Sequence, residues 1–529
     1  MSRVLPPLLP NSWHASDGRA LTAADIGIPE QFNLCEYLLD RHVRAGQGAR
    51  AAVVSADGET SYTALLDQTC TVAASLLASD VRMGERVLLL LPTSLEYIVH
   101  FLAALRIGAV PVLMDPLASP EVYGLVIQES RARVVVIGDS YRPILRNVAD
   151  GVRGSSQYLA VGVADESPQS SAGPDWVADT NRDDEAFWIY TSGSTGWPKA
   201  CVHLHHDLAF CAELYGRNLL GIGPADRILS IPRLHFSYGL ACGLALPLAA
   251  GASTVLWSGS MSPTNVLGLI DTYSPTVLFG VPLNYSELLT KHPNGGKPKE
   301  TRSLRMCVSA GEALPAALVT RFQDRFGVDL VDGIGSTEAP QAFISNRPGQ
   351  VRPGSAGRTV PGFEALILRD DGSPADVDET GHLFVRAESA LSAYWHDYER
   401  SASTILGEWL RTGDMFRRDA DGFYWYAGRS DDMLKIHGEW VSPTEIEAFL
   451  QTHPSVQSAA IVARSDEHQL PAVMAYVVGN PNVDSRLLVR ELSEAAQSKL
   501  PEHKRPRWIE VVGELPRTGT GKIQRFKLK

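Results

Sequence analysis

Cysteine is scarce in this sequence, and its few cysteines do not form short motifs. The chain of 529 residues contains six cysteines, none of them in a C-x-x-C pair. Zinc sites and thiol redox centres usually show such spacings. The sequence therefore gives no support for either kind of site, and it predicts reduced thiols in a cytoplasmic protein.

Excess positive charge is also lacking. The 60 Asp and Glu residues outnumber the 48 Lys and Arg residues, which gives a formal net charge of −12. Nucleic-acid phosphates are bound through clustered Lys and Arg, so this balance disfavours a nucleic-acid partner. An anionic substrate must instead meet positive charge that is concentrated locally.

Long uninterrupted hydrophobic runs are missing as well. The most apolar stretch, residues 87–114, is broken by two prolines, a glutamate and an arginine. It therefore predicts a buried strand, helix and strand rather than a membrane span. The first residues contain no long apolar segment and do not resemble a signal peptide. We expect no membrane partner.

What the sequence does contain is a regular alternation of strand-like and helix-like segments. Apolar strands at 86–91 and 133–137 alternate with helical stretches at 62–78 and 95–107. This rhythm is typical of parallel strands with crossover helices, and after about residue 355 it gives way to short strands and tight turns. Further strands are predicted at 227–231, 253–257, 276–279 and 304–308.

These patterns predict an α/β fold with two domains. Residues 1–430 would form a large N-terminal domain of layered α/β subdomains plus a β-rich subdomain. Residues 431–529 would form a small, mobile C-terminal α+β domain.

One turn concentrates the residue types that bind phosphate. The stretch Tyr190-Thr-Ser-Gly-Ser-Thr-Gly-Trp-Pro-Lys199 follows a short apolar strand and combines glycines, hydroxyl residues and a lysine. Glycines let backbone N–H groups approach phosphoryl oxygens, hydroxyls are further donors, and the lysine adds a positive charge. We predict phosphate binding by the following residues: Thr191, Ser192, Gly193, Ser194, Thr195, Gly196 and Lys199.

This turn has two other interpretations. It is not the common nucleotide P-loop, because Lys199 is followed by Ala200 and the Ser or Thr that holds Mg²⁺ there is missing. An ordinary Gly/Ser loop with a surface lysine has a similar composition. Glycines, hydroxyls and a terminal lysine seldom coincide in such a loop, so phosphate binding is favoured.

A second glycine turn, Asp332-Gly-Ile-Gly-Ser-Thr-Glu338, ends in a hydroxyl and a carboxylate. This ending suits a hard cation on triphosphate oxygens, because Mg²⁺ prefers oxygen ligands and takes few of them from protein. By itself the pattern is weak, and a helix-capping Thr-Glu pair in an ordinary turn explains it equally well.

Two more motifs stand towards the C-terminus. Asp414 closes Trp409-Leu-Arg-Thr-Gly-Asp414, and Arg429 follows downstream. A carboxylate accepts hydrogen bonds from ribose hydroxyls and an arginine binds oxygens, although a structural Arg–Asp pair is the simpler alternative. Lys522 ends Pro516-Arg-Thr-Gly-Thr-Gly-Lys522. A lysine on such a flexible turn can reach a site made by another domain, or it can simply be exposed.

In their order along the chain, these motifs resemble those of the adenylate-forming superfamily, which includes acyl- and aryl-CoA ligases, nonribosomal-peptide adenylation domains and luciferases. The resemblance spans nearly the whole chain. It implies catalytic roles for Lys522, Thr337, Glu338, Thr191 and Lys199. Beside the phosphate turn, it implies ATP binding by Gly311, Glu312, Asp332, Gly333, Ile334, Thr337, Asp414 and Arg429.

The resemblance also implies individual roles within this set. Thr337 would touch the α-phosphate, Glu338 would bind Mg²⁺ and Lys522 would act in adenylation. Asp431 resembles the hinge about which the C-terminal domain turns. The segment 435–440 would face coenzyme A through Lys435 and Gly438, while the roles of His437 and Trp440, which depart from the family pattern, stay open.

An aromatic stretch, Leu234-His-Phe-Ser-Tyr-Gly-Leu240, indicates the class of acid. It suits a flat hydrophobic acid, unless it is simply part of the core. It resembles the Phe-Ala-Tyr-Gly segment of benzoate-type CoA ligases, with serine in place of alanine, and Gln341 stands where those ligases carry a histidine. This added polarity indicates a substituted ring, such as an amino- or hydroxybenzoate. The implied acid pocket is lined by His235, Phe236, Ser237, Tyr238, Gly239, Ile334, Gly335 and Gln341.

A histidine cluster, Cys201-Val-His-Leu-His-His-Asp207, has the composition of a metal site, and His203 and His205 could share a strand face. The run follows the phosphate turn and is expected to enter a helix. We therefore predict packing or surface histidines rather than metal ligands.

The predicted reaction has two steps. An aryl carboxylate attacks the α-phosphate of Mg·ATP to give an acyl-adenylate and pyrophosphate, and the thiol of coenzyme A then displaces AMP to give an aryl-CoA. The rivals are a stand-alone aryl adenylation enzyme that loads a carrier protein, a luciferase-like oxidase, and a regulatory module without catalysis. The ring substituents, the pathway, the thiol acceptor and the oligomeric state, monomer or homodimer, stay open.

Overall fold

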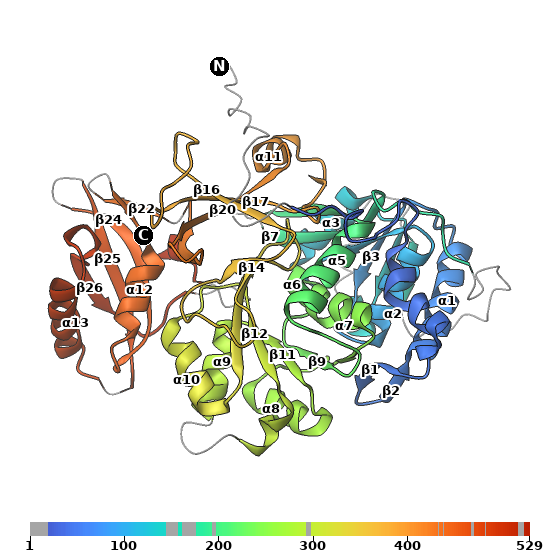
Figure 1. The fold of residues 1–529 in the computed structure, drawn as a ribbon, viewed down its shortest axis with the longest axis horizontal. Helices are drawn as coiled ribbons and strands as arrows, with labels where there is room; N and C mark the ends of the chain where they lie inside the picture. Colours follow the sequence, from blue (N-terminus) through green and yellow to red (C-terminus); the bar gives the residue numbers. More distant parts are fainter. Residues whose placement is uncertain are drawn as a thin grey trace.

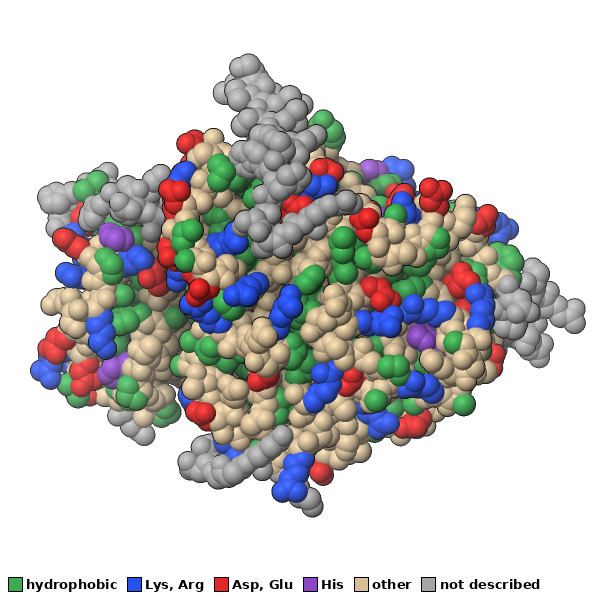
Figure 2. Space-filling model, viewed as in Figure 1, with side chains coloured by type: hydrophobic (Ala, Val, Ile, Leu, Met, Phe, Trp, Pro, Cys, Tyr) green, Lys and Arg blue, Asp and Glu red, His purple; other side chains and the backbone are tan. Residues whose placement is uncertain are grey.

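The computed structural model describes residues 20–143, 157–160, 176–192, 197–291, 298–431, 433–436, 439–466, 470–481, 483–516 and 523–528. Figure 1 shows a large body and, at the end of the chain, a smaller one coloured orange to red. On the face shown in Figure 2, positive and negative side chains are interspersed over both bodies. The net negative charge is therefore not gathered into one acidic patch on this face.

One described sheet of the large body has seven strands in the order β18-β8-β7-β4-β3-β5-β6. Strands β3 to β7 pair in parallel, whereas β7–β8 and β8–β18 are antiparallel. The strands are β3 Arg86–Leu90, β4 Val110–Leu113, β5 Val134–Ile137, β6 Gln157–Ala160, β7 Glu185–Ser192, β8 Pro198–Leu204 and β18 Ala393–Tyr394.

This sheet is covered on both faces, which explains its continuous apolar strands. Leu89 of β3 packs in one hydrophobic cluster with helices α1 (Tyr62–Ala78) and α2 (Leu95–Arg106). Its neighbours Leu88 and Leu90 pack in another cluster with α3 (Pro120–Ser130). Successive side chains of a strand point to opposite faces, so each face has its own helical layer.

A second described sheet has nine strands in the order β15-β14-β13-β12-β11-β9-β10-β1-β2. Its strands are β1 Ala51–Ser55, β2 Gly58–Ser61, β9 Arg227–Ser230, β10 Ser253–Val255, β11 Val277–Gly280, β12 Met306–Ser309, β13 Asp329–Gly335, β14 Ala342–Ser345 and β15 Arg358–Thr359. The helices of this part are α5 His205–Cys211, α6 Ser237–Leu240, α7 Leu246–Ala250, α8 Pro263–Tyr273, α9 Pro282–Lys291 and α10 Ala316–Phe326.

The β-rich part predicted after residue 355 is present as an antiparallel sheet. It contains β16 Glu364–Leu368, β17 Gly381–Arg386, β19 Ile405–Leu406, β20 Trp409–Arg418 and β21 Tyr424–Arg429, with α11 Tyr398–Thr404 beside it. Short π-helical segments lie at 36–40, 43–47, 212–219 and 241–245, and 3₁₀ segments lie at 139–141, 299–303, 502–504 and 525–527.

The smaller body has its own hydrophobic core, in which helices α12 and α13 pack against a three-stranded sheet. Its elements are β22 Leu434–Ile436, β23 Glu439–Val441, α12 Pro443–Gln451, β24 Val456–Ser465, β25 Pro471–Gly479, α13 Ser485–Lys499 and β26 Trp508–Val511. The predicted fold class, a large α/β part followed by a small α+β part, is confirmed. The domain boundary at residue 430 stays a prediction.

Most predicted elements are found at their predicted places, including the strand, helix and strand within 87–114. The histidine-rich run 201–207 enters a helix, as expected. Residues 198–204 form β8, which pairs with β7 along its length, and α5 begins at His205. None of the described helices has the length and apolarity needed to cross a membrane.

Candidate functional site

The phosphate turn lies at the tip of the β7–β8 hairpin. Thr191 of β7 pairs directly with Lys199 of β8, and Ser192 is the last residue of β7. The strand pairing therefore brings two predicted phosphate ligands face to face at the base of the turn. Four predicted ligands, Gly193, Ser194, Thr195 and Gly196, lie outside the described residues, so their roles stay predictions.

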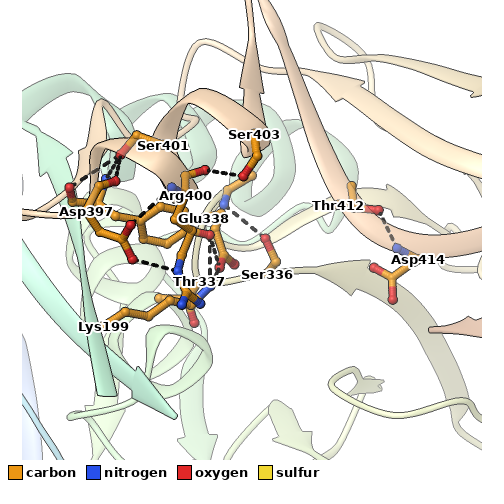
Figure 3. Close-up of polar contacts among 12 residues, drawn as sticks. Lys199, Ser336, Thr337, Glu338, Asp397, Arg400, Ser401, Ser403, Thr412 and Asp414 are labelled. Carbon is orange, nitrogen blue, oxygen red and sulfur yellow. Dashed lines mark hydrogen bonds and ion pairs between the residues drawn. The ribbon is translucent and has the colours of Figure 1, made fainter. Parts of the chain in front are cut away.

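The side chain of Lys199 extends to Glu338, the predicted cation ligand (Figure 3). Lys199 Nζ lies 2.8 Å from Glu338 Oε1 and 2.9 Å from the hydroxyl of Tyr394, which itself donates to Glu338 Oε1 at 2.7 Å. Burial raises the pKa of Glu338, but the charge of Lys199 and the hydrogen bonds from Lys199 and Tyr394 lower it to about 2. Glu338 is therefore held as a carboxylate.

This carboxylate fits Mg²⁺ that arrives on a triphosphate. Magnesium takes oxygen ligands and usually keeps most of them from phosphates and water, so one ionised carboxylate is a sufficient protein contribution. Tyr394 was missed by the sequence analysis. It is placed by β18, whose pairing with β8 sets Tyr394 opposite Cys201.

The carboxyl ends of β12 and β13 lie side by side, because Ser309 pairs with Asp332 in parallel strands. Gly311 and Glu312 follow β12, and the predicted nucleotide residues Gly333, Ile334 and Gly335 end β13. This edge is where open α/β sheets bind ligands. These two segments, which were predicted to bind ATP, are therefore neighbours.

Two buried polar atoms at this edge have no hydrogen-bond partner among the described residues: Ser309 Oγ and Asp332 Oδ1. Burial raises the pKa of Asp332 well above its ordinary value. Buried polar groups are normally satisfied, so unpaired ones at a predicted binding edge fit a ligand with its own donors and acceptors, such as a purine base.

Asp414 and Arg429 face each other across strands β20 and β21. Arg429 Nη1 donates to Asp414 Oδ1 at 3.1 Å and to the carbonyl oxygen of Thr412 at 3.0 Å, and Asp414 lies near Thr412 in Figure 3. Burial raises the pKa of Asp414, although Arg429 acts against it. The structural Arg–Asp pair that the sequence left open is thus present, and it lies close enough to Glu338 for their charges to interact.

The residues predicted for the hinge and for coenzyme A are only partly described. Asp431 is exposed and lies two residues after the end of β21, while the backbone of Lys435 pairs with that of Trp440 in the β22–β23 hairpin. Gly438, His437 and Lys522 lie outside the described residues, so their roles stay predictions.

The predicted acid pocket is built around α6. Tyr238 of this helix donates from its hydroxyl to the carbonyl oxygens of Gly280 (3.3 Å) and Val308 (3.2 Å), at the carboxyl ends of β11 and β12. Ser237 begins the helix and is buried. The aromatic stretch therefore lies at the same sheet edge as the nucleotide residues.

The other predicted pocket residues pack closely around this helix. Gln341 is buried, has a φ of 67°, and donates from its amide to the sulfur of Cys242 at 3.2 Å. His235 and Phe236 precede α6 with their rings 4.3 Å apart, and burial lowers the pKa of His235 to about 4, so the imidazole is neutral. A Cβ on Gly239 would lie 1.9 Å from a backbone oxygen, so this position has room only for glycine.

Cys242 and Tyr215 were missed by the sequence analysis. Cys242 follows Tyr238 by four residues, so helical spacing alone could have placed both on one face. Tyr215 lies near Cys242 and Asp332, whose charges add to the effect of burial in raising its pKa, and it is hydrogen-bonded to Ser345. The sequence around Tyr215 contains no short motif that would have indicated its place in the site.

The histidines of the cluster are buried, as the prediction of packing histidines allows. They do not share a strand face. His203 is on β8 and contacts Asp207, whereas His205 begins α5 and accepts a hydrogen bond from the backbone N–H of Leu34 at 3.1 Å.

Comparisons with known proteins agree with this geometry. The family model described as AMP-binding enzyme matches residues 39–395, and the model described as AMP-binding enzyme C-terminal domain matches residues 445–522. The benzoate–CoA ligase of Thauera aromatica is 38% identical over 521 residues, which cover 96% of this chain and 98% of that protein.

Two solved structures are similar over almost their whole length. The anthranilate CoA ligase AuaEII in complex with anthranoyl-AMP has a TM-score of 0.88 and 36% identity, over 96% of this chain and 98% of that one. A benzoate CoA ligase from Burkholderia xenovorans LB400 has a TM-score of 0.85 and 36% identity, over 94% and 99%. The chain therefore belongs to the family of AMP-binding enzymes, in the aryl-CoA ligase group of the adenylate-forming superfamily.

Proposed function

We propose that this chain is an ATP-dependent aryl-CoA ligase for a benzoate-type acid, such as benzoate, 2-aminobenzoate or a hydroxybenzoate. One observation carries the proposal. Glu338, which is ionised and paired with Lys199, follows the carboxyl end of β13, and the aromatic helix α6 contacts the carboxyl ends of β11 and β12. A nucleotide phosphate and an aryl carboxylate bound there would be neighbours.

In the first half-reaction, the acid carboxylate attacks the α-phosphate and pyrophosphate leaves. Lys199 and Thr191 flank the phosphates, and Thr337 contributes its hydroxyl. Lys522 would bring a further positive charge from the small domain. Fixed charges and donors of this kind stabilise the extra negative charge of the transition state. Magnesium held by Glu338 would neutralise phosphate oxygens.

In the second half-reaction, the thiol of coenzyme A attacks the adenylate carbonyl and AMP leaves. The small domain would turn about Asp431 to present the segment with Lys435 and Gly438. Conformational steps of this kind allow one site to serve two reactions in sequence. The domain boundary at residue 430 belongs to the same proposal.

The pocket favours a substituted ring over an unsubstituted one. Ser237 and Gln341 add a hydroxyl and an amide to an otherwise apolar, aromatic lining. A site built to hydrogen-bond a ring substituent discriminates strongly against an acid without it. The similarity to a structure that holds anthranoyl-AMP agrees with an amino substituent.

Two further features belong to the proposal. Coenzyme A is the proposed acceptor, and a carrier-protein thiol is the alternative, because both present the same pantetheine group. A cytoplasmic location is supported by the six cysteines, which are all free thiols in the structure.

ATP–pyrophosphate exchange with a panel of acids tests the proposal. The panel contains benzoate, 2-aminobenzoate, hydroxybenzoates, cinnamates and medium-chain fatty acids, and the products with coenzyme A are analysed. We expect exchange confined to benzoates, with formation of aryl-CoA. Exchange without aryl-CoA would favour a carrier protein, and no exchange with any acid would contradict adenylation.

A further inference from the structure

Strand β8 contacts both members of the Thr337-Glu338 pair. Lys199 reaches the carboxylate of Glu338, and His203, four residues later on the same face of the strand, reaches the backbone of Thr337. The Nε2 atom of His203 lies 2.9 Å from the carbonyl oxygen of Thr337. The predicted α-phosphate ligand is therefore fixed through its backbone by a side chain.

His203 is itself held firmly. Its Nδ1 atom lies 2.8 Å from Asp207 Oδ2, and both side chains are 0% exposed. The ring of Phe187 stacks on the imidazole with a centroid distance of 4.9 Å and an interplanar angle of 16°. Asp207 also accepts the backbone N–H of Leu204 at 3.1 Å. The imidazole thus has one fixed orientation.

Both nitrogens of His203 face oxygens that accept hydrogen bonds. The carbonyl of Thr337 can only accept. Nε2 must therefore carry the proton of this hydrogen bond, so His203 is the donor that holds the Thr337 backbone.

We propose that His203, held by Asp207, is a positioning residue for adenylation. Its Nε2–H donates to the Thr337 carbonyl and fixes the backbone that presents the Thr337 hydroxyl and the Glu338 carboxylate to Mg·ATP. This inference rests on the proposed function, because adenylation is its readout. It assigns to His203 a role beyond the packing that its burial shows.

Two substitutions of His203 separate its two hydrogen bonds. In His203→Asn the amide takes the place of Nδ1, which preserves the contact with Asp207 and removes the donor to Thr337. In His203→Gln the longer side chain places its amide near Nε2 and restores that donor. His205→Asn is a matched control, because His205 is equally buried and Asn retains an acceptor for the N–H of Leu34.

The readouts are KM for Mg·ATP and kcat in pyrophosphate exchange, together with the temperature of unfolding. We expect His203→Asn to lower kcat/KM for Mg·ATP by about ten- to a hundredfold. Effects of this size are typical when a residue that orients a ligating group through a hydrogen bond is replaced. His203→Gln should recover most of the loss. The rate of aryl-CoA formation from supplied aryl-AMP and coenzyme A should change far less, because Thr337 and Glu338 act on the phosphates of ATP.

The inference is overturned if His203→Asn and His205→Asn lower adenylation equally for the same loss of stability, or if His203→Asn leaves KM and kcat unchanged. If His203→Asn does not fold, Asp207→Asn takes its place, since it alters the side chain that holds Nδ1 of His203. The loss of adenylation activity in Asp207→Asn should again be larger than the loss in the control His205→Asn. Failure of the proposed function looks different, because wild-type protein would then show no exchange with any acid.

Discussion

Lys199 and Glu338 form an ion pair of 2.8 Å that joins the two large sheets, with side chains 19% and 18% exposed. Lys199 is on β8 of the seven-stranded sheet, and Glu338 follows β13 of the nine-stranded sheet. This ion pair, with the Tyr394 hydroxyl that contacts both side chains, links the base of the phosphate turn to the proposed cation ligand. A substitution that weakens this ion pair should therefore disturb both the phosphate turn and the proposed cation ligand.

Replacing Lys199 by methionine should therefore abolish most of the adenylation activity. We expect kcat for pyrophosphate exchange to fall by about a hundredfold, because a fixed charge beside the phosphates is lost. Lys199→Arg is the control, since it preserves the charge and should retain more activity. Exchange at the wild-type rate in Lys199→Met would contradict a phosphate role for this residue.

The Glu338 carboxylate should make stability depend on pH. Its pKa is lowered from 4.5 to about 2 in the folded protein. A lowered folded pKa means that the carboxylate stabilises the fold above the unfolded pKa, and that this contribution disappears as pH falls towards 2.

The pH dependence is measured by denaturant unfolding at a series of pH values, from pH 7 down to the lowest pH at which the protein is still folded. The difference in the free energy of unfolding between wild type and Glu338→Gln should be constant at neutral pH and shrink below about pH 4.5. Glu494→Gln, at an exposed site on α13, controls for the loss of one carboxylate. A difference that grows on acidification would refute the ion pair as its source.

Gly335 should tolerate no side chain. A Cβ at this position would lie 1.8 Å from the carbonyl oxygen of Gln341, which is backbone and cannot simply rotate away. Gly335→Ala should destabilise the protein by about 1–3 kcal/mol through overpacking. Gly223→Ala is the matched control, since nothing lies within 4 Å of its Cβ. Equal midpoints of urea unfolding for the two variants would show that the close approach is not present in solution.

Gln341 should determine the preference for a substituted ring through a hydrogen bond to the substituent. Replacing it by leucine removes the amide while retaining similar bulk, so kcat/KM for hydroxy- or aminobenzoates should fall more than tenfold relative to benzoate. Competition between the acids in pyrophosphate exchange measures the ratio directly. An unchanged ratio would place the substituent elsewhere in the pocket, for example against Ser237.

Lys522 should serve only the first half-reaction. Lys522→Ala is expected to lose adenylate formation, while transfer from supplied aryl-AMP to coenzyme A survives. The two rates are measured separately, with pyrophosphate exchange for the first and thiol consumption for the second. Equal loss of both would mean that the lysine acts in both steps or that the variant is misfolded, and the unfolding temperature distinguishes these cases.

The sequence predicted the parts of the site that are local. Thr191 and Lys199 stand in a short motif whose chemistry is readable without a structure. Glu338 stands in a weaker motif, whose role was predicted only from the family resemblance, and the alternation of strands and helices predicted the layered fold. The point at which β8 gives way to α5 could not be read from the sequence, because the pairing of β8 with β7 decides where the strand ends.

The missed residues depend on contacts between distant segments. Tyr394 reaches Lys199 from 195 positions away in the sequence, and His203 reaches Thr337 from 134 positions away. Strand register decides both contacts, and a single sequence does not specify register between distant strands. Both residues therefore looked like ordinary aromatic or packing residues.

The linker between the two bodies is fixed at one end. Ser430 donates from its N–H (2.9 Å) and from its hydroxyl (3.0 Å) to the carbonyl oxygen of Gly413, the neighbour of Asp414. A rotation that begins at Asp431 would break no hydrogen bond of the β20–β21 ladder. The proposed ribose ligand Asp414 belongs to this ladder, so a bound adenylate could be retained, rather than released to water, while the proposed small domain changes position.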